Sequence, residues 1–142
     1  MFLGEYQHSL DAKGRVILPV KFRDQVQRGS FVSKGVDGCL CVYVNEEWER
    51  VANEVRELAK RGAKERQAAR SFFSGAMEAI PDRQGRIAIP QHLRDFAGLD
   101  REVVVAGVFS RIEIWDAQRW SERNREGEAS LAAAEDLPDF GI

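Results

Sequence analysis

The 142-residue chain has only two cysteines and two histidines, and these shortages exclude whole classes of protein. Two cysteines cannot form the dense disulfide framework of a small secreted domain. Cys39 and Cys41 are weak evidence for a zinc site, because there is no second cysteine pair and only His8 and His92 remain to complete it. We therefore expect free thiols that are packed or half-exposed, no metal and no cofactor.

Long apolar segments are also missing. No run approaches the roughly 18 apolar residues that a membrane-spanning helix requires. The first residues, Met1 to Tyr6, lack the basic region and the apolar stretch of a secretory signal. The expected location is the cytoplasm, with no membrane partner.

The sequence has no recognisable catalytic constellation. It contains no nucleophile beside a base, no glycine-rich phosphate loop and no cluster of metal ligands. Its many carboxylates follow no evident pocket pattern. We therefore expect that the protein is not an enzyme.

One segment of the chain occurs twice, 71 residues apart. The first copy runs from Asp11 to Asp24 and the second from Asp82 to Asp95. Six residues recur in identical register: Asp11, Gly14, Arg15, Pro19, Arg23 and Asp24, then Asp82, Gly85, Arg86, Pro90, Arg94 and Asp95. A repeat of this size indicates two copies of one supersecondary unit.

Each copy has the pattern of a strand, a tight loop, a strand and a short helix. In the first copy, strands at 5–10 and 15–18 flank a loop at 11–14, a spacing typical of a β-hairpin. Asp11 can hydrogen-bond its own backbone, and Gly14 can adopt a positive φ. The second copy predicts the same elements at 78–80, at 81–85, at 86–89 and from Pro90 onward.

Further strands and helices follow each copy. Amphipathic spacing predicts helices over 46–61 and 64–73 between the repeats. The additional strands are expected at 30–33, 39–44, 102–106 and 111–115. Because a hairpin-rich unit this small cannot bury both of its faces alone, the two copies are expected to close one shared core. That core would be a small β-barrel with pseudo-twofold symmetry and helices around it.

This pattern divides the chain into four parts. They are a first repeat at 5–47, a helical connection at 48–75, a second repeat at 76–119, and a C-terminal helix with an acidic tail at 120–142.

Charge is unevenly distributed although its sum is only −2. No Lys or Arg follows Arg125, and five acids do: Glu126, Glu128, Glu135, Asp136 and Asp139. The first 125 residues therefore have 21 basic and 18 acidic side chains, a net charge of +3. An acidic tail is typically a solvated, disordered end. A tail that competes with DNA for the basic loops is the second interpretation.

The candidate functional residues lie in the two loops, where Asp11 precedes Arg15 and Asp82 precedes Arg86 by four positions. An arginine at a hairpin tip can fork onto a phosphate or onto a guanine edge. An aspartate there is expected to orient the arginine by hydrogen bonding. The same residues can instead form an exposed ion pair worth about 0–1 kcal/mol, and the sequence leaves both interpretations open.

Other residues of the repeat are additional candidates for the binding surface. Lys13 and Arg83 lie inside the loops as additional cations, and Gly14 and Gly85 end them. The later arginines, Arg23 and Arg94, either support the same surface or belong to a solvated helix face. We expect any binding surface to be built from these residues.

The doubled Asp-x-x-x-Arg motif, each time followed by a short apolar strand and a proline, resembles the MraZ family of the SpoVT–AbrB superfamily. Further matches are Met1-Phe-Leu-Gly4, Asp11-Ala-Lys-Gly-Arg15, Gly98-Leu99 and the segment from Phe109 to Trp115. The resemblance covers about residues 1–125 and leaves the acidic tail outside. The pair Cys39 and Cys41 is individual to this chain.

The resemblance implies an α+β fold, in which two tandem SpoVT–AbrB half-units form a pseudo-twofold swapped-hairpin β-barrel with peripheral helices. It implies a nucleoid-associated transcriptional regulator of the bacterial division and cell-wall gene cluster. Such a regulator binds short direct repeats of double-stranded DNA near its own promoter and assembles into a ring-like homo-oligomer. Arg15 and Arg86 are the DNA-contacting residues of that pattern, with Lys13 and Arg83 beside them.

A protein-binding scaffold or antitoxin-like module with the same AbrB fold is the alternative function. The acidic tail and the amphipathic helix at 46–61 are the segments that would bind the partner protein.

Overall fold

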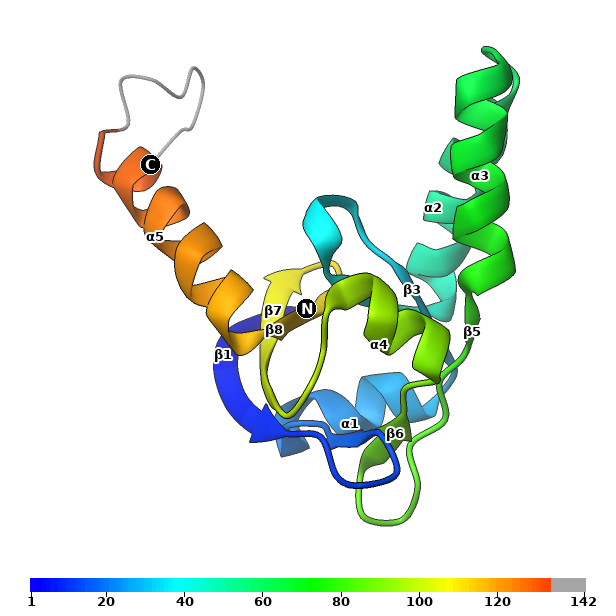
Figure 1. Ribbon diagram of the computed structural model, residues 1–142. Coiled ribbons are helices and arrows are strands. Elements are labelled where there is room, and N and C mark those ends of the chain that lie inside the picture. Colours follow the sequence, from blue (N-terminus) through cyan, green and yellow to red (C-terminus); the bar gives the residue numbers. More distant parts are fainter. Residues whose placement is uncertain (134–142) are drawn as a thin grey trace.

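The computed structural model describes residues 1–133 and consists of two similar halves joined by a helical connection (Figure 1). The first half comprises β1 (Phe2–Ser9), β2 (Arg15–Ile17), α1 (Val20–Gln27), β3 (Ser30–Lys34), the 3-10 helix η1 (Val36–Gly38) and β4 (Leu40–Val44). The connection comprises α2 (Asn45–Ala59) and α3 (Ala63–Gly75). The second half comprises β5 (Met77–Glu78), β6 (Arg86–Ala88), α4 (Gln91–Ala97), β7 (Glu102–Phe109), β8 (Ile112–Asp116) and α5 (Ala117–Ala132). The mixed α+β class is therefore confirmed.

The strands form a six-stranded antiparallel sheet and a separate two-stranded ribbon. The order in the larger sheet is β1-β7-β8-β4-β3-β5, and the ribbon pairs β2 with β6. The order is the same from either end once corresponding strands of the two halves are exchanged. The first strand of each half pairs with the third strand of the other half, so neither half completes its own sheet. Closure of these strands into a barrel stays a prediction.

The expectation of a local hairpin in each repeat is wrong in its pairing. β2 is antiparallel to β6 of the other copy, with Val16 opposite Ile87, whereas β1 pairs with β7. A strand of three residues forms few hydrogen bonds and cannot bury its apolar side chains within an isolated hairpin. The pairing of β2 with its counterpart β6 in the other repeat buries Val16 and Ile87 completely. The other predicted strands and helices are present with shifted ends.

The main core lies between the ribbon, the short helices and one face of the large sheet. Both halves contribute to it, with Leu18 and Leu40 from the first and Ile89 and Ile112 from the second among the fully buried side chains. A smaller apolar cluster covers the opposite face of the sheet. Its buried members are Cys39, Cys41, Tyr43 and Trp115, and the tryptophans of α2 and α5 pack against them. Both cysteines are free, as predicted, and of the two expected placements, packed or half-exposed, both are buried.

The helices at the ends of the halves point away from the ribbon. In Figure 1 the pair α2 and α3 and the long α5 extend from one end of the molecule, whereas the loops beside β2 and β6 lie at the other.

Among residues 1–133, no helix combines the length and apolarity needed to cross a bilayer. The acidic segment is helical as far as Ala132, so its expected disorder is wrong up to that residue. The tail acids Glu135, Asp136 and Asp139 lie outside the described residues.

We expect Ile87→Ala to lower the free energy of unfolding by about 2–5 kcal/mol, because it leaves a cavity where the two repeats meet. Ile80→Ala is the matched control, since Ile80 is 71% exposed, and it should change stability by no more than about 0.5 kcal/mol. Urea unfolding followed by circular dichroism measures both. Equal stabilities of the two variants would contradict the assignment of the ribbon to the shared core.

Candidate nucleic-acid interface

The loop of the first repeat is organised by the Asp11 carboxylate. Its Oδ1 accepts the backbone N–H groups of Lys13 and Arg15, each at 2.9 Å. Its Oδ2 accepts the Nε–H of Arg15 at 2.7 Å. The backbone N–H of Gly14 donates to the Asp11 carbonyl at 3.0 Å and closes the turn. One carboxylate thus holds both the backbone of the loop and the side chain of its arginine.

The second loop repeats this arrangement bond for bond. Asp82 Oδ1 accepts the backbone N–H groups of Gln84 and Arg86 at 2.9 and 3.0 Å, and Oδ2 accepts Arg86 Nε–H at 2.8 Å. The glycines that end the loops, Gly14 and Gly85, have φ values of 74° and 79°. These values lie in the left-handed region that glycine adopts without steric cost. The same sequence signals therefore produce the same turn twice.

The hydrogen bonds of the loops also control the charge of the aspartates. The backbone N–H of Arg15 lowers the pKa of Asp11 below its ordinary value, partial desolvation opposes this, and the guanidinium of Arg15 lowers the pKa further. The backbone N–H and side chain of Arg86 act on the pKa of Asp82 in the same way. Both aspartates are consequently ionised at neutral pH, so a charged carboxylate accepts the hydrogen bonds of each arginine.

Pairing of β2 with β6 places the two loops side by side. Arg15 lies opposite Ala88, and Ile17 lies opposite Arg86, so the two arginines occupy one face of the ribbon. Arg86 Nη1 also approaches Asp11 Oδ2 of the other loop, at 3.9 Å. The side chains of Arg15 and Arg86 are each 29% exposed. The two arginine side chains are thus held in position and still reach solvent.

Two further arginines lock each loop onto the opposite repeat. Arg23 donates its Nε–H to the Leu18 carbonyl at 2.9 Å, and a Cβ on Gly85 would lie only 2.2 Å from that nitrogen. Arg94 stands in the equivalent place, bonded to the Ile89 carbonyl and packed against Gly14. A side chain at either glycine would displace the arginine that packs against it.

Backbone hydrogen bonds complete this exchange between repeats. The Leu18 N–H donates to the Gly85 carbonyl at 2.8 Å, and the Ile89 N–H donates to the Gly14 carbonyl at 2.9 Å. From the sequence, Arg23 and Arg94 could either support the loops or belong to a solvated helix face. The structure places both half-buried against the loops, and their recurrence in the same register was the signal for it.

The outer surface of the loops is cationic. Lys13 and Arg83 are exposed at the two tips and have no carboxylate within ion-pairing distance in the described part of the chain. The segments 11–15 and 82–86 together contain four cations and two aspartates, a net charge of +2. The arginines lie on the outer face of the ribbon, whose other face is buried in the core, and a forked guanidinium there can reach a phosphate or a base edge. The geometry thus suits phosphate and base contacts.

We expect the double variant Asp11→Asn/Asp82→Asn to have a melting temperature a few degrees below that of the wild type at neutral pH. The reason is that an uncharged amide oxygen accepts the hydrogen bond of a guanidinium more weakly than a carboxylate does. The folded-state pKa of each aspartate is lowered, so its contribution to stability is complete above the unfolded pKa near 3.8. The difference in melting temperature should shrink as the pH falls below that value and vanish beneath the folded pKa. Calorimetry across pH measures it, with Asp24→Asn as an exposed control. A difference that persists in strong acid would contradict this role.

Comparison with known proteins agrees with the repeat structure. The family model described as "MraZ protein, putative antitoxin-like" matches residues 1–71 and again residues 72–137. A relative from Syntrophomonas wolfei named "Transcriptional regulator MraZ" is 45% identical over 143 residues, which cover 100% of both chains. Relatives of the same name from Heliobacterium modesticaldum and Lachnoclostridium phytofermentans are 44% and 46% identical, each over 100% of this chain and 100% and 99% of the relative. With matches across both halves and along its full length, the chain belongs to the MraZ family.

Proposed function

We propose that this protein is a sequence-specific DNA-binding transcriptional regulator whose β2–β6 ribbon contacts the duplex. The observation that carries the proposal is the pair of matching Asp–Arg loops held side by side, with both arginines on the outer face of one ribbon. The name of its relatives supports a role in transcription. In this proposal the half-units exchange their first strands and close a swapped-hairpin barrel, which gives the loops a rigid base.

The residues of the interface have different roles in the recognition of DNA. Arg15 and Arg86 present forked guanidinium groups whose direction is fixed by the aspartates, which suits readout of guanine edges. Lys13 and Arg83 lie at the exposed tips, where a flexible cation contacts phosphate. Asp11 and Asp82 do not touch the DNA and act through the arginines that they orient.

Affinity requires more than one copy of this surface. A chain of net charge −2 neutralises few phosphates and has weak intrinsic affinity for DNA. A ring-like homo-oligomer presents many copies of the loops, and tethering raises the effective concentration for each later contact. Short direct repeats near the protein's own promoter, in the division and cell-wall gene cluster, are the target that we propose. The protein would act in the cytoplasm at the nucleoid.

An apolar patch at the end of the β1–β7 edge supports self-association. Leu3, Val108 and Phe109 are 57%, 36% and 65% exposed, although all three are apolar. Leu3 and Val108 are opposite one another, and β1 is an edge strand of the large sheet. Exposed apolar side chains at a sheet edge are typical of an interface between chains. We propose that this patch is buried between neighbouring subunits of the ring.

We expect Arg15→Ala and Arg86→Ala each to weaken binding to the DNA upstream of the protein's own gene by about 1–3 kcal/mol per loop contact. Gel-shift titrations across salt concentrations measure this loss. A residue that contacts only phosphate weakens all sequences alike and lowers the salt slope by about one, whereas a base-reading residue also relaxes sequence preference.

The matched control is Arg61→Ala, which removes the same charge from the exposed turn between α2 and α3, far from the ribbon (Figure 1). It should leave binding unchanged. The loop assignment is wrong if the Arg15→Ala/Arg86→Ala variant binds the operator as tightly as the wild type at moderate salt.

We expect Phe109→Asn to dissociate the assembly without unfolding the chain. Phe109 has φ 65°, a backbone conformation that asparagine tolerates better than phenylalanine, so the fold should be at least as stable. Native mass spectrometry and thermal unfolding measure the two effects. Val20→Asn, at a 73% exposed position on α1, is the control and should leave the assembly intact. A wild-type monomer, or an unchanged assembly in Phe109→Asn, would rule out this interface.

A further inference from the structure

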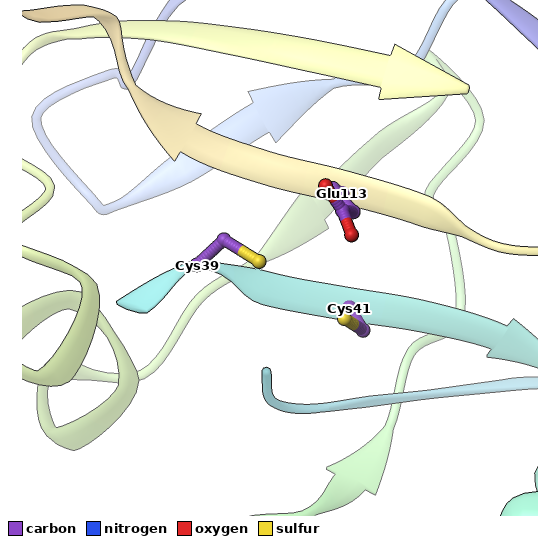
Figure 2. A group of neighbouring side chains, drawn as sticks. All are labelled: Cys39, Cys41 and Glu113. Carbon is purple, nitrogen blue, oxygen red and sulfur yellow. The ribbon is translucent and has the colours of Figure 1, made fainter. Parts of the chain in front are cut away.

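Three chemically active side chains meet on the face of the sheet opposite the main core. Cys39 immediately precedes β4, Cys41 lies on β4, and Glu113 lies on the neighbouring β8 directly opposite Cys41 (Figure 2). The two sulfur atoms and one carboxylate oxygen all lie within 4.8 Å of one another. All three residues are buried, with Cys39 0%, Cys41 3% and Glu113 8% exposed. Two thiols and a carboxyl group at this spacing are the donor types that zinc prefers.

Both sulfur atoms converge on one small space beside Gly35. A Cβ built on Gly35 would lie 2.8 Å from Cys41 Sγ and 2.9 Å from Cys39 Sγ. Gly35 has φ −103°, which any residue adopts, so the backbone does not require glycine here. The absence of a side chain at this position leaves room next to the thiols.

A further buried oxygen lies on the same face without a hydrogen-bond partner. Ser33 of β3 is paired with Cys41, so Ser33, Cys41 and Glu113 form a row across three adjacent strands. Ser33 is 0% exposed, and its Oγ makes no hydrogen bond to any described residue. A buried hydroxyl without a partner is unfavourable, so this oxygen is free to face an additional polar ligand on that side of the sheet.

We propose that Cys39, Cys41 and Glu113 bind a zinc ion on the sheet face that also contains Ser33. The two thiols each lose a proton to solvent, and the two thiolates balance the charge of Zn²⁺. The donor atoms, now within 4.8 Å of one another, have to draw together slightly to reach metal–ligand distances of about 2.0–2.3 Å. No redox step or further reactant is involved.

The surroundings of Glu113 are suited to hold it as a ligand. Arg111 donates to Oε2 at 2.7 and 3.0 Å, and Trp115 Nε1–H donates to Oε1 at 2.9 Å. A carboxylate has about four acceptor positions, so these bonds leave room for a metal. They also fix the orientation of the group, as partners behind a metal ligand commonly do. Arg111 balances the charge of Glu113 whether or not the ion is bound.

A cavity lies beside Gly35, the residue that both sulfur atoms face. Gly35, Val36 and Tyr43 line a cavity of about 400 Å³ between η1 and the helices α2 and α3. Zinc binds thiolates and not thiols, so its binding should release protons, which titration calorimetry in buffers of different ionisation enthalpy detects.

The test uses the reduced full-length chain, titrated with Zn²⁺ by calorimetry and with Cd²⁺ by ultraviolet absorbance. We expect one ion per chain and a cadmium–thiolate charge-transfer band that Cys39→Ser and Cys41→Ser each abolish. Glu113→Gln should weaken Zn²⁺ binding about tenfold or more. Asp37→Asn is the matched control, because Asp37 is an exposed acid of η1 outside the cluster, and it should bind as the wild type does.

A second measurement needs no variant and therefore does not depend on how the variants fold. X-ray absorption at the zinc edge of the wild-type complex should show two sulfur ligands per ion. The proposal is overturned by a wild-type chain that binds no zinc, by zinc with only nitrogen and oxygen ligands, or by folded cysteine variants that retain the cadmium–thiolate band. None of these results bears on DNA binding, so failure of this site is distinguishable from failure of the regulator proposal.

Discussion

The antiparallel pairing of β2 with β6 is the contact on which the rest of the structure depends. It places Val16 opposite Ile87 within the shared core, and neither strand pairs with any other strand of the described residues. It also brings each loop against the other repeat, where cross-repeat backbone bonds end on the carbonyls of Gly14 and Gly85. Stability and the candidate binding surface therefore share one origin. A change that separates the two strands removes the core and the paired loops together.

The charges of the loops are organised rather than simply accumulated. Each aspartate neutralises part of its arginine and so lowers the net attraction to a polyanion, but it fixes the direction of the guanidinium group. Fixed direction favours recognition of particular base edges, whereas unpaired cations favour any phosphate. A chain with almost no net charge gains little from non-specific attraction. Directed arginines presented in many copies are thus consistent with selective, multivalent binding.

The two faces of the large sheet have different chemistry. One face belongs to the apolar core shared by the repeats, and the other contains the cysteines, Glu113 and the tryptophans of α2 and α5. From the sequence, the two histidines are the residues that would complete a metal site with Cys39 and Cys41. Glu113 is far away along the chain and enters the cluster because β4 pairs with β8 in a register that sets it opposite Cys41. No local pattern around either cysteine indicates that neighbour.

The amino-acid sequence alone determined the existence of two repeats, the turn in each loop and most of the strands and helices. Those features are local: an aspartate and a glycine at fixed spacing produce the same hydrogen-bonded turn in either half. Only the tertiary structure decided which strands pair, because short strands take the partner that buries the most apolar surface, and here that partner is in the other repeat. The places of Arg23, Arg94 and Glu113 followed from the same long-range pairing, since each meets residues that are distant in the chain.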